Sequence, residues 1–355
     1  MATRNKHVPG VSKQSPMITI LPHEQLTIAF DQLGGCLRPL WEEGPPPTDA
    51  GQAYSEACTT PATTAIHAHL HYLDLVPELL DACRVIENRR LLLNTDSPFK
   101  AAVIQRLLSE RGEQNVVVRV CHNRGRDLAP MLLDWHDEIQ ACELLIHCHT
   151  KKTPHAHTGF GRGWRRSLLR ATFPDRQTCS AWQALLQNPA SGVILPWPHR
   201  FVAHNVNWGS NFVQTRQLMA AMGWPIERQT FLYFPAGSFF WARVDALRPL
   251  FGLGLRRQDF APEPMAADGH LAHALERCLG LVPMLQNRRN YVSWMGDAAH
   301  AIAAMRPEPC LVALPRHNDV ASLVGTWFDD GLQRALESRG SRDQALALGA
   351  LLATA

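Results

Sequence analysis

The sequence predicts an α/β domain with a mostly parallel, Rossmann-type sheet flanked by helices. Between residues 66 and 150, short apolar segments with strand character alternate with longer segments of helical periodicity, which is the pattern of successive βαβ units. Three of the strand segments end in polar residues. Since ligands of such sheets bind beyond the carboxyl ends of the strands, these segments also predict where a site lies.

The first half of the domain supplies four strands and three helices. Pro77 falls in the first turn of the first helix and Ser97 opens the second before a proline, and both are favoured helix starts. Strands are expected at 66–73, 89–96, 115–123 and 143–150, and helices at 74–86, 97–111 and 125–142.

The second half is less regular and richer in aromatic residues. It predicts helices at 163–173 and 179–188, a strand at 191–198, a loop leading into a helix at 207–223, a strand–turn–strand unit opening a helix at 232–247, and a helix at 268–281. The last helix is amphipathic, with one apolar face formed by Leu271, Leu275, Cys278 and Leu279.

Composition divides the chain into four regions. An N-terminal extension with one short helix (1–43) is followed by a Pro-, Gly-, Thr- and Ala-rich flexible linker (44–64). The main domain covers 65–300, and a C-terminal helical extension covers 301–355. The extension ends in an apolar stretch, 345–355, that is expected to pack on the domain, with peripheral membrane contact as the alternative.

Charge and cysteine usage favour a cytoplasmic protein that does not bind nucleic acid. The net charge is only +3, and the basic residues form no stripe. Nine irregularly spaced cysteines without a C-x-x-C predict reduced thiols. No apolar segment follows the basic start, and none approaches the roughly 20 residues of a membrane span.

The polar strand ends are expected to meet at one edge of the sheet. They are Asn94 to Asp96, Asn123 to Asp127, and His149 to Lys152. Parallel strands bring their carboxyl ends to the same edge, so these side chains predict one site.

The segment LLIHCHTKKT (144–153) admits three interpretations. His147 and His149 alternate on a strand and could ligate a metal, and the H-x-H pattern recurs at 67–71. However, two of the chain's five lysines, Lys151 and Lys152, follow directly. At roughly 6 Å and an effective dielectric near 20, each ammonium would repel a divalent cation by a few kcal/mol and stabilise a diphosphate by a similar amount. Satisfied strand histidines and anion contacts are therefore favoured over metal ligands.

Two turns are further candidates. Gly125, between Arg124 and Arg126 before a helix, forms an anion-binding arrangement, with a plain tight turn as the alternative. Asp127 could cap that helix or accept hydrogen bonds from a ribose or base. The turn at 235–238 exposes backbone amides beside aromatic residues, which suits a sugar face or a diphosphate, and a hydrophobic hairpin is the alternative.

Asp268 lies at the start of the helix expected at 268–281. It is either an N-cap or a carboxylate at the edge of a cleft that takes a proton from an acceptor hydroxyl. Glu276 and Arg277 lie on later turns and are expected to form a structural ion pair.

Together these segments resemble the rhamnan synthesis protein F family of bacterial polysaccharide assembly. The resemblance is carried by NRGRDLAP (123–130), HTKKTPH with GWRRSLL (149–169), FPAGSFFWAR (234–243), DGHLAHALER (268–277) and the opening HAHLHYLDLVPELL (67–80), and it covers about residues 66–285. It implies a GT-A-like glycosyltransferase that moves a deoxyhexose, with rhamnose favoured, from a nucleotide-diphosphate sugar onto a polysaccharide or lipid-linked glycan.

The resemblance also implies roles for individual residues. Asp268 takes the place of the catalytic base. The nucleotide-diphosphate site is expected to contain Asn123, Arg124, Gly125, Asp127, His149, Lys151, Lys152 and Arg165. The sugar and acceptor pocket is expected to contain Trp208, Gly237, Ser238 and Trp241.

The sequence departs from the GT-A pattern in its metal motif. No D-x-D occurs anywhere, and His147-Cys148-His149 occupies that place. No cofactor is therefore firmly implied, and Mg²⁺ or Mn²⁺ dependence stays open. The expected location is the cytoplasm or the inner membrane face. Two rival interpretations are a metal-dependent hydrolase built on the H-x-H pairs and a non-catalytic glycan-assembly module.

Overall fold

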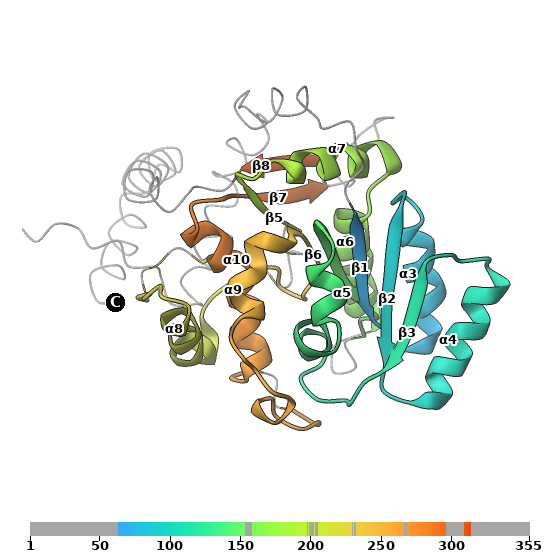
Figure 1. Ribbon diagram of the computed structural model, residues 1–355, viewed down its shortest axis with the longest axis horizontal. Helices are drawn as coiled ribbons and strands as arrows, with labels where there is room; N and C mark the ends of the chain where they lie inside the picture. Colours follow the sequence, from blue (N-terminus) through green and yellow to red (C-terminus); the bar gives the residue numbers. More distant parts are fainter. Residues whose placement is uncertain are drawn as a thin grey trace, which may run out of the picture.

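The computed structural model describes residues 63–152, 158–196, 198, 202, 205–228, 230, 232–265, 268–295 and 309–313. They form an eight-stranded sheet with helices on both faces (Figure 1). Its order is β3-β2-β1-β4-β6-β5-β7-β8. The strands are β1 (Thr64–His69), β2 (Arg89–Thr95), β3 (Val116–Val120), β4 (Leu144–His149), β5 (Ser191–Pro196), β6 (Phe240–Arg243), β7 (Arg289–Met295) and β8 (Pro309–Ala313).

Most neighbouring strands run parallel. β1 pairs in parallel with β2 and β4, β2 with β3, and β5 with β7. β6 lies antiparallel between β4 and β5, and β8 runs antiparallel to β7. The predicted fold class, an α/β domain with a mostly parallel Rossmann-type sheet, is confirmed.

Two apolar cores lie on opposite faces of the sheet because successive strand side chains point to opposite sides. Leu92 of β2 belongs to one core, and Leu91 and Leu93 to the other. Helices α5, α8, α9 and α10 contribute to the first core, and α3, α4, α6 and α7 cover the second (Figure 1). The helices are α3 (Val76–Cys83), α4 (Pro98–Glu110), α5 (His136–Gln140), α6 (Thr158–Thr172), α7 (Arg176–Gln187), α8 (Phe212–Ala221), α9 (Val244–Phe251) and α10 (Leu271–Leu285).

Three local expectations are wrong. The helix expected at 125–142 is a π-helical turn at Pro130–Asp134 followed by the short α5; the amide of Trp135 bonds the carbonyl of Pro130, 3.1 Å away. The first strand expected within 232–247 is absent from this described segment, where β6 is followed directly by the start of α9. Residues 309–313, expected to be part of a helical extension, form β8. The N-terminal extension (1–43), the linker up to residue 62 and most of the C-terminal extension (301–355) lie outside the described residues.

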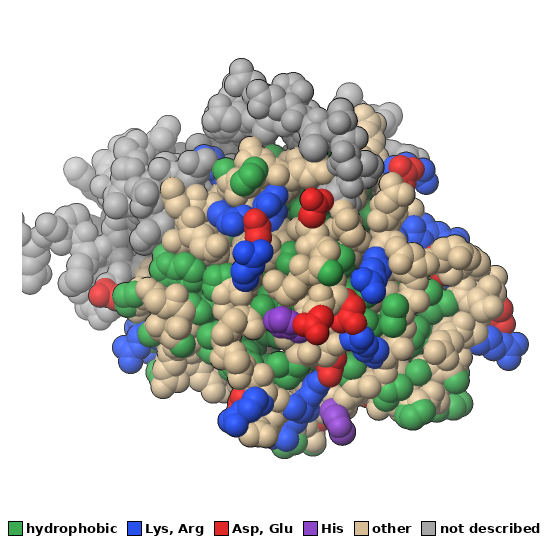
Figure 2. Space-filling model, viewed as in Figure 1, with side chains coloured by type: hydrophobic (Ala, Val, Ile, Leu, Met, Phe, Trp, Pro, Cys, Tyr) green, Lys and Arg blue, Asp and Glu red, His purple; other side chains and the backbone are tan. Residues whose placement is uncertain are grey.

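The described cysteines are free thiols, namely Cys83, Cys121, Cys142, Cys148, Cys179 and Cys278. Among the described helices, none is both long enough and apolar enough to cross a bilayer. On the face drawn in Figure 2, basic and acidic side chains are interspersed rather than gathered into a positive stripe.

A Gly280→Ala substitution tests how closely α10 packs on the segment before β6. A Cβ at Gly280 would lie 1.8 Å from the backbone carbonyl oxygen of Tyr233, and this atom belongs to the main chain and cannot rotate away. We expect the free energy of unfolding to fall by about 1–3 kcal/mol or more in urea denaturation. Gly252→Ala is the control, since its Cβ would have only ordinary contacts at 3.6 Å; an equal loss in both variants would contradict the packing.

Candidate functional site

The candidate site lies at the carboxyl edge of β1, β2 and β4. Because β6 is antiparallel to β4, the turn before β6 reaches the same edge, where Phe240 pairs with His147. Thr150, directly after β4, donates its amide to the carbonyl of His69 at 3.0 Å. The expected convergence of strand ends is therefore present, and the reversed strand adds the turn at 235–238.

Gly125 and Arg124 determine the conformation of the loop after β3. Gly125 has a φ of +77°, and a Cβ there would lie 2.5 Å from Ala129 and from Phe260. Arg124 donates to the carbonyls of Phe260 and Gln258. Arg124 therefore anchors this loop, and its guanidinium is already engaged by protein carbonyls.

Asp127 is the buried carboxylate of that loop. Its Oδ2 lies 3.1 Å from Nε2 of His147, and its side chain is nearly inaccessible. Burial alone would raise the pKa of Asp127, but His149 and the hydrogen bond from His147 hold it well below its ordinary value. Asp127 is thus a fixed carboxylate at the base of the site, whereas Asn123 is exposed.

The three candidate cations differ in their surroundings. Lys152 pairs with Asp74 at 2.7 Å, and Arg165 pairs with Glu78 at 2.8 Å. Lys151 instead lies with its ammonium 4.0 Å from the centre of the Trp164 ring. Burial lowers the pKa of Lys151, and Glu276 and Asp127 oppose that shift. Within the described part of the chain no carboxylate lies within 4 Å of the Lys151 ammonium, so it is the cation best placed to receive an anion.

The turn before β6 is clamped from two sides. Gly237, at a φ of +101°, donates its amide to Oε1 of Glu276 at 2.8 Å, and its carbonyl lies 2.9 Å from Nε2 of His149. Ser238 donates its hydroxyl to the same Oε1 at 3.1 Å. Gly237 and Ser238 therefore occupy the site edge, held there by a carboxylate of α10.

Glu276 is the functional candidate that the sequence interpretation missed. The expected ion pair with Arg277 is present but long, with 3.9 Å between the closest atoms. The shorter bonds of Glu276 go to the turn. Burial raises the pKa of Glu276 above its ordinary value, although Arg277 and the Gly237 amide oppose this. Its spacing of 39 residues from Gly237 left no local signal in the sequence.

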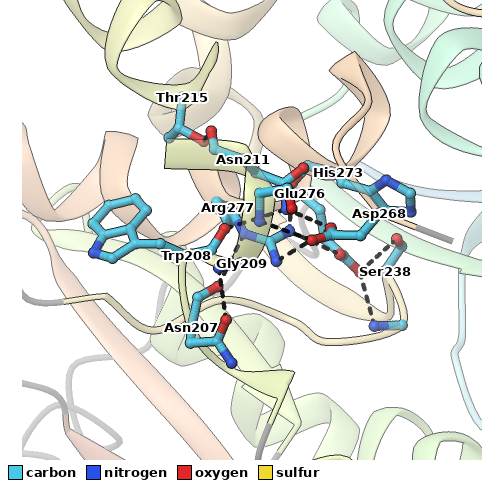
Figure 3. A network of polar contacts seen from close by, with 12 residues as sticks. Asn207, Trp208, Gly209, Asn211, Thr215, Ser238, Asp268, His273, Glu276 and Arg277 are labelled. Atoms are coloured by element: carbon cyan, nitrogen blue, oxygen red, sulfur yellow. Dashed lines mark hydrogen bonds and ion pairs between the residues drawn. The ribbon is translucent and has the colours of Figure 1, made fainter. Parts of the chain in front are cut away.

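Asp268 is not an N-cap of α10, so that alternative is wrong. The helix begins at Leu271 with His270 at the N-cap position. Asp268 accepts a hydrogen bond from the amide of Ser210 at 2.9 Å and another from the Asn211 side chain (Figure 3). The Asn211 oxygen in turn accepts from the amide of Gly269 at 3.1 Å.

These bonds set the charge and the accessibility of Asp268. Burial would raise its pKa, but the bonds from Asn211 and Ser210 lower it below the ordinary value, so the carboxylate is ionised at neutral pH. Its side chain is 41% exposed, and the Arg277 guanidinium lies 3.9 Å away (Figure 3). Asp268 is therefore an oriented, ionised carboxylate with part of its side chain accessible.

Two of the expected pocket residues belong to the cores instead. Trp241 is 1% exposed, donates its indole N–H to the carbonyl of Thr172 and packs against Trp182. Trp208 is 7% exposed and donates to the carbonyl of Arg228. Large aromatic side chains gain more from burial than other residues. The expectation that Trp208 and Trp241 line a sugar pocket is therefore wrong.

The histidines of the H-x-H pair at 147–149 are engaged by protein groups. Nε2 of His147 bonds Asp127 and its Nδ1 bonds His67, so both ring nitrogens are occupied. His149 bonds the Gly237 carbonyl. No group of three or more His, Cys, Asp or Glu side chains placed to hold a metal occurs among the described residues.

A Gly209→Ala substitution tests whether the Gly209–Asn211 segment (η4) positions Asp268. Gly209 has a φ of +50°, and a Cβ there would lie 2.5 Å from Oδ2 of Asp268. The added Cβ would displace the Asp268 carboxylate. We expect the catalytic rate to fall at least about tenfold, because small misplacements of a reacting group reduce the rate by that much. Gly254→Ala is the matched control: it has a φ of +64° but nothing within 4 Å of the added Cβ, so it shares the backbone strain and should keep the activity.

The neutral histidines of the site predict a pH dependence of stability. Burial lowers the pKa of His69 and of His149 from 6.5 to about 4. Below pH 6.5 the unfolded chain therefore binds more protons than the folded one, and stability falls until about pH 4. Each histidine contributes up to about 3 kcal/mol. Urea midpoints measured from pH 7.5 to 4.5 should drop, and less steeply in His69→Gln than in the control His136→Gln, whose side chain is 42% exposed. Equal slopes would contradict this.

Fold and site define an α/β protein with a cluster of polar and charged side chains at the carboxyl edge of its sheet. The profile of the rhamnan synthesis protein F family matches residues 49–288, and the chain belongs to this family.

Similar proteins include two curated relatives and one solved structure. The relatives are uncharacterized WxcX proteins from two strains of Xanthomonas campestris pv. campestris, 31% identical over 251 residues. The aligned part is 66% of this chain and spans only 33% of each relative's length. The mannosyltransferase PcManGT from Pyrobaculum calidifontis, in complex with GDP-mannose and Mn²⁺, is 12% identical with a TM-score of 0.37 over 76% of this chain and 66% of that one.

Proposed function

We propose that this chain is a GT-A-like glycosyltransferase that moves a deoxyhexose, with rhamnose favoured, from a nucleotide-diphosphate sugar onto a bacterial polysaccharide or lipid-linked glycan. Membership of the rhamnan synthesis protein F family supports this class of reaction. The observation that carries the proposal is an ionised, oriented carboxylate, Asp268, near a cation without a carboxylate partner among the described residues, Lys151. The two are linked through α10 and the turn before β6, since Arg277 lies 3.9 Å from Asp268, Glu276 bonds Gly237, and Gly237 lies beside Lys151. The proposed location is the cytoplasm, at the inner membrane face when the acceptor is lipid-linked.

The donor binds on the β4 side of the cleft. Lys151 faces the diphosphate and stabilises the negative charge that develops on it as the glycosidic bond breaks. His149 and Gly237 lie beside Lys151, where the Gly237 carbonyl bonds His149 and its amide bonds Glu276. Asp127 accepts hydrogen bonds from the nucleoside.

The acceptor binds on the α10 side. Asp268 takes the proton of the attacking hydroxyl as that oxygen bonds to the anomeric carbon, and the nucleoside diphosphate leaves from the same carbon. A single accessible carboxylate fits an inverting course. Glu276 accepts hydrogen bonds from the Gly237 amide and the Ser238 hydroxyl and so fixes the turn before β6.

Lys152 and Arg165 join the donor site only if they exchange their present partners. Both are paired with carboxylates of the segment 74–78. An incoming diphosphate would compete with Asp74 for Lys152, and this exchange is easiest there because both groups are exposed. Lys151 needs no such exchange.

Turnover of a panel of nucleotide sugars tests the proposal. The purified chain is incubated with dTDP-, GDP- and UDP-hexoses and deoxyhexoses, with an oligosaccharide acceptor, and release of the nucleoside diphosphate is measured. Release from one donor that depends on the acceptor is the expected result. If no donor is consumed while nucleotides or glycans still bind, the non-catalytic glycan-assembly module is the better account.

A further inference from the structure

A row of hydrogen-bonded side chains crosses three strands beneath the cleft. His67 of β1, Asn94 of β2 and His147 of β4 are completely buried. Three distances of 2.8, 2.8 and 3.1 Å join, in order, Asn94 Oδ1 to His67 Nε2, His67 Nδ1 to His147 Nδ1, and His147 Nε2 to Asp127 Oδ2. At the other end, Nδ2 of Asn94 lies 2.6 Å from Nδ1 of His69.

The contact between the two Nδ1 atoms restricts where the protons are. Each hydrogen bond needs one hydrogen, and a neutral imidazole carries a single N–H. If His67 donates from Nε2 to Asn94 and His147 donates from Nε2 to Asp127, both neutral rings have used their hydrogens. Their Nδ1 lone pairs would then face each other at 2.8 Å. With Asn94 in this orientation and Asp127 ionised, one ring must be a buried imidazolium.

A half-turn of the Asn94 amide removes the need for that charge, because it exchanges a donor and an acceptor of nearly the same shape. His69 then donates from Nδ1 to the Asn94 oxygen, and the Asn94 amide donates to His67 Nε2. His67 donates from Nδ1 to His147, which donates from Nε2 to Asp127. Each contact holds one hydrogen, and all three rings are neutral.

The surroundings favour this neutral order. Burial lowers the pKa of His67 well below its ordinary value, and His147 lowers it further. The rings are enclosed by aromatic side chains: Phe240 lies 5.2 Å from His147, and Trp135 lies 6.4 Å from His67, measured between ring centres. In such a low-dielectric interior an unmatched donor or acceptor is costly, so the donors of the row keep one common direction.

We propose that Asn94, His67 and His147 are positioning residues whose hydrogen bonds all run toward Asp127 and hold its carboxylate ionised, with Oδ1 left to accept a hydroxyl or N–H group of the donor's nucleoside. Oδ1 has no hydrogen-bond partner among the described residues. An ionised carboxylate repels a diphosphate, so the row assigns Asp127 to the nucleoside and leaves the phosphates to Lys151. The identity of the ligand rests on the proposed function, whereas the order of the row does not.

The proton order is tested by nitrogen NMR of the ¹⁵N-histidine-labelled chain at pH 7. We expect His67 as the neutral Nδ1–H tautomer and His147 as the neutral Nε2–H tautomer. A hydrogen on Nε2 of His67, alone or together with one on Nδ1, would overturn the proposed order. This measurement uses the unaltered protein and is independent of any activity.

The link to binding is tested with Asn94→Asp, measured by calorimetric titration with dTDP and GDP. An ionised carboxylate at 94 can only accept, so His67 must donate from Nε2. With neutral rings, His147 then donates from Nδ1 to His67, and its Nε2 can accept only from a protonated Asp127. The row therefore reverses, and the Asp127 carboxylate takes up a proton. We expect the His67 tautomer to switch and the nucleoside diphosphate to bind at least about tenfold more weakly. Thr95→Val is the control, since it removes a neighbouring buried bond to the Leu70 carbonyl but leaves the row intact.

The outcomes separate the row from the proposed function. A switched tautomer with unchanged binding would show that the row does not act on the ligand through Asp127. If the unaltered chain has the expected tautomers but binds no nucleoside diphosphate, the proposed function fails and the proton order stands.

Discussion

An Asp268→Asn variant is expected to lose about 10²- to 10⁴-fold in kcat, the usual contribution of a positioned general base. The amide cannot take the proton of the acceptor hydroxyl. It also keeps only one of the two hydrogen bonds, because its NH₂ group would face either the Asn211 side-chain donor or the amide of Ser210. Donor binding should change little, because the proposed donor contacts lie on the β4 side of the cleft.

The measurement is kcat together with the Kd of the donor on the same protein. Asp175→Asn serves as the matched control: Asp175 caps α7 by accepting the amide of Thr178, and asparagine caps equally well. An Asp268→Asn enzyme with normal kcat would remove Asp268 from the reaction, and loss of donor binding alone would move it to the donor site.

A Lys151→Met variant is expected to lower kcat/KM by about 10²- to 10³-fold, as removal of one group that stabilises the transition-state charge does. Methionine keeps an apolar stem to pack against Trp164 and beside Gly237, so the ammonium is the main loss. The other two candidate cations, Lys152 and Arg165, are already paired with Asp74 and Glu78.

Lys152→Met is the matched control for this experiment. Lys152 is exposed and engaged by Asp74, so its loss should reduce kcat/KM less than tenfold. Equal losses in the two variants would show that the Lys152–Asp74 pair opens for the donor. A larger loss in Lys152→Met would contradict the assignment to Lys151.

The sequence was sufficient for the elements that depend on local pattern. Alternating apolar strands and helices between residues 66 and 150 predicted the parallel sheet, and the polar residues after β4 and β3 predicted the edge where Lys151 and Asp127 lie. The two lysines after His149 also favoured hydrogen-bonded strand histidines, and both ring nitrogens of His147 have protein partners.

The remaining features depend on contacts that leave no local signal. The partners of Asp268 lie 57 and 58 residues away, and the bond between Glu276 and Gly237 spans 39 residues. Trp208 and Trp241 were misassigned because an aromatic residue near a turn has the same sequence signature in a pocket and in a core. The strand–turn–strand expectation failed because β6 has only four residues, and the segment before it packs on Gly280 instead.

The proposed site binds a nucleotide-diphosphate sugar through the Lys151 ammonium rather than through a metal motif. Calorimetric titration of dTDP- and GDP-deoxyhexoses into the chain in the presence of EDTA, with Lys151→Met in parallel, tests it most directly. Binding of one donor that survives EDTA and is lost in Lys151→Met is the predicted result. Binding that disappears with EDTA, or that is unchanged in Lys151→Met, would contradict the claim.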